Sequence, residues 1–224
     1  MKPLLIAGNW KSNKTTVEAT QWLRTFQLAI PNVSKESTTI VLCAPYTVLG
    51  SIKWQIGASH LPIVLGAQDV SPYPDGAYTG EVSARIVKDV ADWVIIGHSE
   101  RRKNFGETDE MLAQKVIQAK TAGLKIIFCV PDAQTVVPEG VDAVGYEPVW
   151  AIGTGKSDTP ENANDVIATI KAKSQVRTVI YGGSVTPENV ASFVAQPAID
   201  GVLPGGASLD AEKFARLCLA AVGK

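Results

Sequence analysis

The stretch "LLIAGNWK" (residues 4–11) is an apolar run with a polar exit, and no G-x-G-x-x-G pattern follows it. Successive apolar residues without polar alternation are typical of a parallel strand that is buried on both faces. An open, doubly wound sheet that binds a dinucleotide carries the glycine pattern directly after its first strand. This beginning therefore favours a closed barrel over an open sheet.

Seven further apolar runs follow along the chain, and most are separated by segments with helical spacing, such as Phe214, Leu217 and Cys218. The eight runs are Leu4–Ala7, Thr39–Ala44, Ile63–Gly66, Trp93–Gly97, Lys125–Val130, Ala143–Tyr146, Thr178–Gly182 and Asp200–Leu203. Strands joined by helical crossovers predict an all-parallel sheet, and eight of them close into a (β/α)8 barrel. A doubly wound sheet is the alternative. No linker interrupts the alternation, so we expect a single catalytic domain over residues 1–224.

Local signals mark where several helices begin and end. Thr159-Pro160 and Thr186-Pro187 each place a threonine N-cap before a proline at the first helical position. Gly123 is placed to end a helix that spans about residues 108–122. The segment "PDAQTVVPEGVD" (131–142) holds two prolines and a glycine and has little room for a helix. The helix between the fifth and sixth strands is therefore predicted to be shortened or missing.

Composition excludes several classes of protein. The 224 residues are 46% hydrophobic and 19% charged, which supports a sizeable core and argues against disorder. A net charge of −1 without a basic cluster argues against nucleic acid or an anionic membrane as a partner. The first apolar run is too short for a signal peptide or a membrane span. Cys43, Cys129 and Cys218 are widely spaced and indicate buried thiols in a reducing, cytoplasmic compartment, not disulfides or a metal site.

Polar residues follow several of the predicted strands, at the end of the barrel where this fold carries its chemistry. Asn9 and Lys11 follow the first strand, His98 the fourth and Glu147 the sixth. Each of the charged or ionisable residues also has a structural interpretation without catalysis. Lys11 could keep its charge in water, His98 could be a hydrogen-bonded structural group, and Glu147 could be part of a salt bridge. Together they supply a cation, a hydrogen-bond donor and a base, the groups that proton transfer next to a carbonyl requires.

Paired glycines follow the last two strands, in "GGS" (182–184) and "GGAS" (205–208). Either pair alone could form a tight turn. In these two loops a barrel of this type binds phosphate through bare backbone N–H groups and a helix N-terminus. The combination suits a small phosphorylated sugar as the substrate.

The sequence resembles the triosephosphate isomerase family from end to end. The motifs that carry the resemblance are "GNWK" (8–11), "GAYTGE" (76–81), "IGHSERR" (96–102), "FGET" (105–108), "YEPVWAIGTG" (146–155), "YGGSV" (181–185) and "GGASL" (205–209). They occur in the family's order. The resemblance implies a TIM barrel and an aldose–ketose isomerase of glycolysis and gluconeogenesis that interconverts dihydroxyacetone phosphate and glyceraldehyde 3-phosphate.

The resemblance also implies roles for individual residues. Glu147 matches the general base and His98 the neutral imidazole that polarises the carbonyl, a division of roles already known for this family. Lys11 matches the cation that stabilises the enediolate, and Asn9 a donor beside it. Residues 148–156 match a flexible lid that closes over the substrate. The matching phosphate-binding residues are Gly153, Ser184, Gly205 and Gly206, and the supporting residues are Glu100, Thr79, Trp150 and Tyr181. No cofactor or metal is implied.

The segment "SPYPDGAYTGE" (71–81) resembles the loop with which one family member docks into its neighbour. Thr79 would reach toward the neighbour's Asn9 and Lys11, so the resemblance implies a homodimer. A tetramer is the alternative, because short members that lack the fifth helix form tetramers. Two other functions stay open: a phosphosugar-binding barrel without catalysis, and a sugar-phosphate epimerase. The epimerase would need metal ligands at strand ends, and His60 and His98 are the chain's two histidines.

Overall fold

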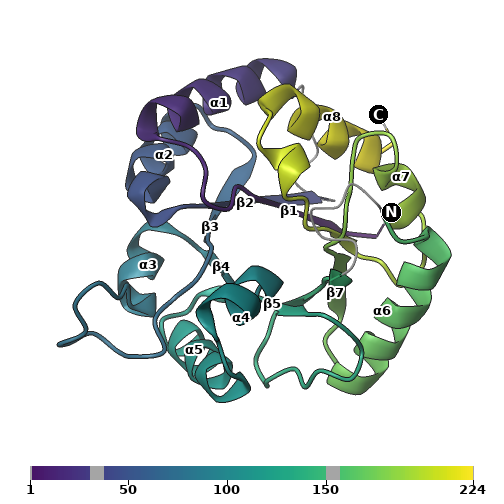
Figure 1. The fold of residues 1–224 in the computed structure, drawn as a ribbon. Helices are drawn as coiled ribbons and strands as arrows, with labels where there is room; N and C mark the ends of the chain where they lie inside the picture. The colour runs from purple at the N-terminus through teal and green to yellow at the C-terminus, as the bar shows by residue number, and fades with distance from the viewer. Residues whose placement is uncertain (1, 31–37, 150–156, 224) are drawn as a thin grey trace.

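The computed structural model describes residues 2–30, 38–149 and 157–223, in which eight parallel strands form a closed barrel (Figure 1). The strands are β1 (Leu4–Asn9), β2 (Thr38–Ala44), β3 (Ile63–Ala67), β4 (Trp93–Ile96), β5 (Lys125–Val130), β6 (Ala143–Tyr146), β7 (Thr178–Tyr181) and β8 (Gly201–Val202). Each pairs with its neighbour in chain order, and β8 closes the ladder against β1 through the pairs Leu5↔Gly201 and Ile6↔Val202. The closed ladder confirms the predicted barrel and excludes the doubly wound sheet.

Helices form a ring around the barrel (Figure 1). They are α1 (Thr16–Ala29), α2 (Tyr46–Ala58), α3 (Ala84–Val90), α4 (Ser99–Phe105), α5 (Asp109–Thr121), α6 (Pro160–Ser174), α7 (Val190–Val194) and α8 (Ala211–Ala221), with a short 3-10 helix η2 (Gly206–Ser208) before α8. Within the described parts of the chain, no helix has the length and apolarity that a bilayer crossing requires.

The segment between β5 and β6 contains turns and no helix, as the sequence predicts. Asp132 Oδ1 accepts the backbone N–H groups of Gln134 and Thr135 at 2.8 and 2.9 Å, which holds the chain in a tight turn after Pro131. The strands pair directly nonetheless, from Ile127↔Ala143 to Val130↔Tyr146. The barrel therefore closes without a helix over this pair.

Two of the three local helix signals are confirmed. Thr159 caps α6 by accepting the Asn162 N–H at 3.2 Å, and Gly123 follows α5 with a left-handed φ of 75°. The predicted helix start at Thr186 is wrong. Residues 187–189 form a turn, in which Asn189 Oδ1 accepts the Thr186 N–H at 2.8 Å and the Thr186 carbonyl accepts the Val190 N–H at 3.0 Å, and α7 begins at Val190.

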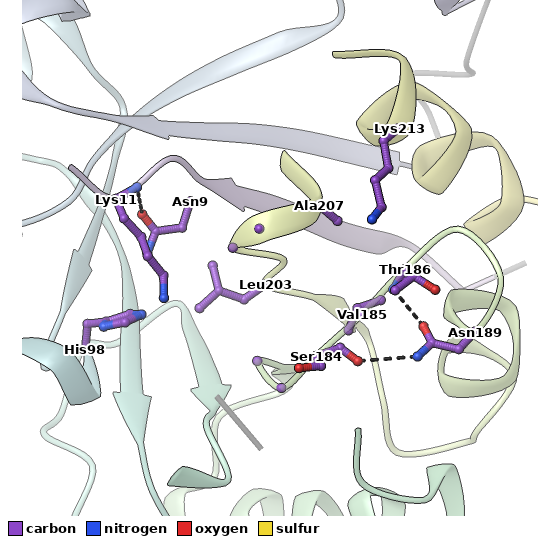
Figure 2. Close-up of a pocket in the computed structure, with 14 residues that line it drawn as sticks. Asn9, Lys11, His98, Ser184, Val185, Thr186, Asn189, Leu203, Ala207 and Lys213 are labelled. Atoms are coloured by element: carbon purple, nitrogen blue, oxygen red, sulfur yellow. Dashed lines mark hydrogen bonds between the residues drawn. The ribbon is translucent and has the colours of Figure 1, made fainter. Parts of the chain in front are cut away.

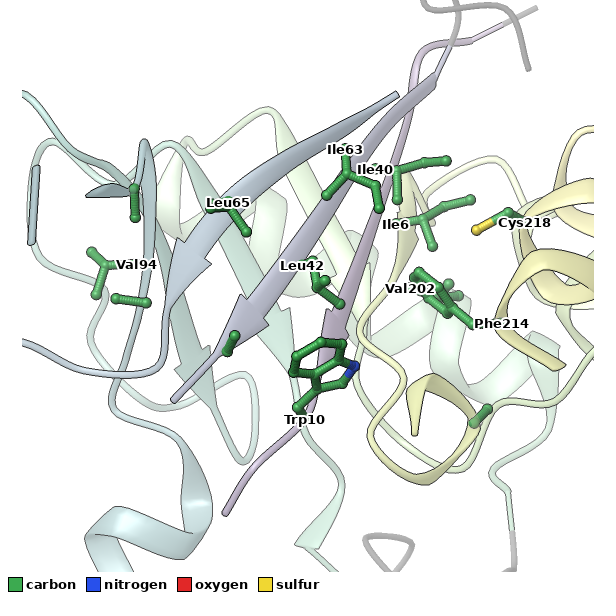
Figure 3. Packing of buried hydrophobic residues seen from close by; sticks show 14 of the residues in the cluster. Ile6, Trp10, Ile40, Leu42, Ile63, Leu65, Val94, Val202, Phe214 and Cys218 are labelled. Atoms are coloured by element: carbon green, nitrogen blue, oxygen red, sulfur yellow. The ribbon is translucent and has the colours of Figure 1, made fainter. Parts of the chain in front are cut away.

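The core has two layers because successive strand residues point to opposite faces. Leu5, Ala7 and Val41 belong to an inner cluster that is built from strand residues and fills the barrel. Ile6 and Leu42 point outward, where the larger cluster packs the strands against the helices, including Phe214 and Cys218 of α8 (Figure 3). This packing fixes the strand ends that carry the polar residues.

Candidate active site

The carboxyl ends of the strands open into a cavity of about 310 Å³ (Figure 2). Predicted site residues from four strand ends meet there: Asn9 at the end of β1 and Lys11 after it, His98 after β4, Ser184 after β7, and Gly205 and Gly206 after β8. The other lining residues are Gly182, Gly183, Val185, Thr186, Asn189, Leu203, Ala207 and Lys213.

Lys11 is held in a strained backbone conformation at the cavity. Its φ of 53° is left-handed, which costs a non-glycine residue about 1–2 kcal/mol. Two hydrogen bonds fix it: the Lys11 N–H donates to Asn9 Oδ1 at 2.9 Å, and the Lys11 carbonyl accepts from Gln68 Nε2 at 2.9 Å. The Lys11 ammonium forms an ion pair with Glu100. Asn9 and Gln68 therefore fix the backbone of Lys11, from which its side chain extends to the cavity.

The hydrogen bonds of His98 define its tautomer. His98 is buried at the N-cap of α4, and its Nδ1 accepts the Glu100 N–H at 3.2 Å, so Nδ1 carries no proton. The neutral ring therefore carries its proton on Nε2, which lies 3.1 Å from Glu147 Oε1.

The carboxylate of Glu147 lies beside the cavity and does not line it. Its side chain is only 2% exposed, and a buried carboxylate requires donors. Oε2 accepts the Ser99 N–H at 2.8 Å, while Oε1 faces His98 Nε2. In this arrangement the acid is joined to the histidine loop, and contact with a molecule in the cavity requires its side chain to turn away from Ser99.

The two glycine loops present backbone donors to the cavity. Within the described parts of the chain, the N–H groups of Gly183, Gly205 and Gly206 make no hydrogen bond. A Cβ on Gly183 would lie 2.2 Å from the Tyr181 hydroxyl, so close packing requires glycine there. The Ser184 carbonyl accepts from Asn189 Nδ2 at 3.3 Å, which steadies the first loop. The bare amides form a site for an anion.

Tyr181 supports the chain on one side of this site. Its hydroxyl accepts the Asp158 N–H at 2.9 Å, and its ring stacks on Phe193 with centroids 4.3 Å apart. Burial raises the pKa of Tyr181 to about 12, so the hydroxyl stays protonated at neutral pH. Tyr181 thus links β7, α7 and the start of α6.

The predicted lid and the predicted loop residue Thr79 do not contribute to the described cavity wall. Trp150 and Gly153 lie outside the described residues, as does most of the predicted lid at 148–156. Thr79 is exposed in the loop that projects from the barrel before α3 (Figure 1), and it does not line the cavity of its own chain. Glu100 contacts Lys11 at the cavity's edge.

Sequence reasoning missed Gln68, Asn189 and Lys213. Gln68 directly follows β3, so its strand-end position would have identified it. Asn189 comes three residues after Thr186, a spacing at which an asparagine side chain can accept a backbone N–H. Lys213 lies in the first turn of α8 and has no comparable signal in the sequence.

Comparison with known proteins agrees with this geometry. The family model described as "Triosephosphate isomerase" matches residues 4–221. The chain is 42% identical to a triosephosphate isomerase of Synechocystis sp., covering 97% of this chain and 98% of the relative, and 40% identical to one of Synechococcus sp., covering 97% and 96%. The crystal structure of triosephosphate isomerase from Bartonella henselae superposes with a TM-score of 0.81 at 30% identity, covering 98% and 99% of the two chains. The chain therefore belongs to the triosephosphate isomerase family.

Proposed function

We propose that the protein interconverts dihydroxyacetone phosphate and D-glyceraldehyde 3-phosphate, with Glu147 as the general base. The observation that carries this proposal is the arrangement around one cavity of about 310 Å³: a lysine, a neutral imidazole in contact with a buried carboxylate, and a set of bare backbone amides. These groups match the needs of an enediolate reaction on a phosphorylated substrate.

The substrate phosphate would bind at Ser184, Gly205 and Gly206, which seats the reacting carbons toward Lys11 and His98. Binding of the phosphate at fixed amides places the reacting carbons near the catalytic groups before any proton moves. This positioning lowers the activation barrier of the proton transfer. The phosphate itself is unchanged in the reaction. Its role is therefore to orient the substrate.

In the proton transfer, Glu147 turns from Ser99 into the cavity and removes a proton from the carbon next to the carbonyl. His98 Nε2–H donates to the carbonyl oxygen, and Lys11 and Asn9 stabilise the negative charge of the enediolate. Glu147 then returns the proton to the neighbouring carbon, while His98 moves the hydroxyl proton between the two oxygens. The family resemblance assigns the lid role to residues 148–156 and a phosphate-binding amide to Gly153, and both stay predictions.

We also propose one catalytic domain over residues 1–224, a homodimer and a cytoplasmic location. The loop that projects before α3 (Figure 1) supports the dimer. Tyr73 and Tyr78 stack there with ring centroids 4.4 Å apart, yet they are 48% and 40% exposed. Exposed aromatic rings on a stiffened loop fit a contact with a second copy, in which Thr79 would approach the partner's site.

The direct test is turnover of glyceraldehyde 3-phosphate by the wild-type protein in a coupled assay, with calorimetric titration of inorganic phosphate in parallel. Turnover together with competitive inhibition by phosphate supports the proposed isomerase. Phosphate binding without turnover, with intact folding by circular dichroism, would replace it with the non-catalytic phosphosugar-binding barrel.

A further inference from the structure

We propose that Lys213 is a second cation of the phosphate site and that it binds the substrate's phosphate dianion, an inference that rests on the proposed function. Lys213 lines the cavity from the first turn of α8. Figure 2 shows its side chain reaching toward the cavity on the side of Thr186 and Asn189, away from Lys11 and His98. The two lysines therefore border the cavity at different ends.

Lys213 is a cation at the cavity wall, and the acid that it affects electrostatically, Glu188, is not among the lining residues. No Asp or Glu is among the lining residues that the structure describes. The Lys11 ammonium is paired with Glu100, whereas the Lys213 ammonium forms no ion pair or hydrogen bond within the described parts of the chain. A phosphate ester carries a charge of about −1.5 to −2 at neutral pH. Backbone amides are only partial charges, so a full positive charge at the glycine loops complements this dianion.

The position of Lys213 in α8 is unfavourable for the helix itself. Asp210 caps the helix and accepts the Lys213 N–H at 2.7 Å, which makes Lys213 the third helical residue. A capping box places Glu or Gln there, as Glu18 does opposite Thr15 in α1. A cation in the first turn also opposes the helix dipole. A residue that breaks local rules without a structural gain indicates a role outside the helix.

This contact would act on binding and not on the chemical step. The phosphate keeps its charge and position while protons move at the other end of the substrate. An interaction of equal strength in the ground and transition states changes KM and leaves kcat unchanged. Lys213 is partly exposed, so water and salt weaken its attraction to the phosphate.

The test measures KM for glyceraldehyde 3-phosphate and the inhibition constant for inorganic phosphate in Lys213→Gln and Lys213→Arg. At low salt we expect both constants to rise about three- to tenfold in Lys213→Gln, with kcat within about twofold of wild type. Added salt should shrink this difference. Lys213→Arg should restore most of the affinity. Tm should stay equal or rise in Lys213→Gln, because glutamine completes the capping box.

Arg216→Gln is the matched control, since Arg216 lies three residues further along α8, is exposed and does not line the cavity. The two cations have a similar electrostatic setting: the pKa of Glu188 is lowered chiefly by its hydrogen bond from Thr186, with smaller contributions from Arg216 and Lys213. Arg216→Gln should leave both constants unchanged. Equal constants in Lys213→Gln and Arg216→Gln would overturn the proposal.

The two proposals fail in different ways. An inactive wild type would contradict the isomerase, and calorimetric phosphate affinities of the same variants would still decide the role of Lys213. An active wild type, with phosphate affinity unchanged in a folded Lys213→Gln, would contradict Lys213 alone.

Discussion

Glu147 contacts the histidine loop, which is distant from it in the chain. Its Oε1 lies 3.1 Å from His98 Nε2, and its Oε2 accepts the N–H of Ser99, 48 positions earlier in the sequence. The hydrogen bond at Nδ1 fixes the proton of the neutral imidazole on Nε2. The same ring nitrogen would donate to a substrate oxygen once Glu147 turns away. One rotation of Glu147 would therefore free both the base and the donor.

The imidazole of His98 is expected to carry chemistry that an amide cannot perform. His98→Asn should lower kcat by about 10²–10⁴-fold with a small effect on KM, since general acid–base catalysis contributes that much. His60→Asn is a matched control, because His60 is exposed and its left-handed φ of 52° suits asparagine. Coupled-assay kinetics decide the matter, and equal activity in the two variants would remove His98 from the mechanism.

The sequence identifies which residues reach the site and not how they point. Asn9, Lys11 and His98 were found because strand ends of a barrel meet at one rim. The placement of the Glu147 carboxylate depends on the Ser99 N–H of another loop, and that of Lys11 on Gln68. These side-chain orientations depend on hydrogen-bond partners that are distant in the sequence. A local sequence pattern therefore cannot predict them.

At the level of elements, barrel closure depends on Gly201 in β8. Its φ is +152°, and an added Cβ would lie 1.9 Å from the carbonyl oxygen of Leu5 in β1. Gly201→Ala should therefore destabilise the fold by more than about 4 kcal/mol, the range of severe core disruption. Gly50→Ala, in open space on α2, should instead stabilise by about 0.5–1 kcal/mol. Urea unfolding measures both, and comparable stability of the two variants would contradict this account of closure.

The buried ammonium of Lys115 links α5 to the loop after β3. Its side chain is 3% exposed, and it donates to Asp69 at 2.6 and 2.8 Å and pairs with Glu107. Lys115→Met should cost about 1–3 kcal/mol, because it removes buried donors from Asp69 and Glu107 and leaves Arg101 to pair with both carboxylates. Lys120→Met, at an exposed position of α5, should change the free energy of unfolding by less than about 0.5 kcal/mol. Similar losses in both variants would show that the ion pairs contribute nothing net.

Some elements follow from the sequence more closely than others. β5 and β6 have the predicted bounds, because strands buried on both faces are continuous apolar runs. The helix predicted from Thr186 begins only at Val190, although the Thr186 N–H bonds to Asn189 Oδ1 and the Thr186 carbonyl accepts the Val190 N–H, as at a capped helix start. The cap signal therefore locates the first turn and not the first residue of the regular helix.

At the scale of the whole molecule, a protruding loop and a missing helix both bear on assembly. The loop before α3 leaves the body of the barrel (Figure 1). Its Asp75 pairs with Arg85 of α3 and accepts from Ser83, which ties the loop to the start of α3. Residues 131–142 leave the β5–β6 pair without a covering helix. The first feature supports a dimer, and the second is the one that accompanies tetramers in short family members.

Sedimentation velocity at micromolar concentration should show a dimer as the smallest abundant species. Tyr78→Ser should shift the protein toward monomer and lower turnover, because the exposed ring would lie in the contact. Val17→Ser, which alters another exposed apolar residue on α1, is the comparison that should leave the dimer intact. A wild type that sediments only as an active monomer would refute the proposed assembly.

The most direct test of the account is the turnover number of Glu147→Asp beside wild type, with the exposed Glu161→Asp as the matched control. The substitution keeps the carboxylate and withdraws it by one methylene, about 1 Å, from the carbon that it must reach. We predict that turnover falls by at least about a hundredfold in Glu147→Asp, the cost of such a displacement, and is unchanged in Glu161→Asp. Wild-type turnover in Glu147→Asp would contradict the assignment of Glu147 as the base.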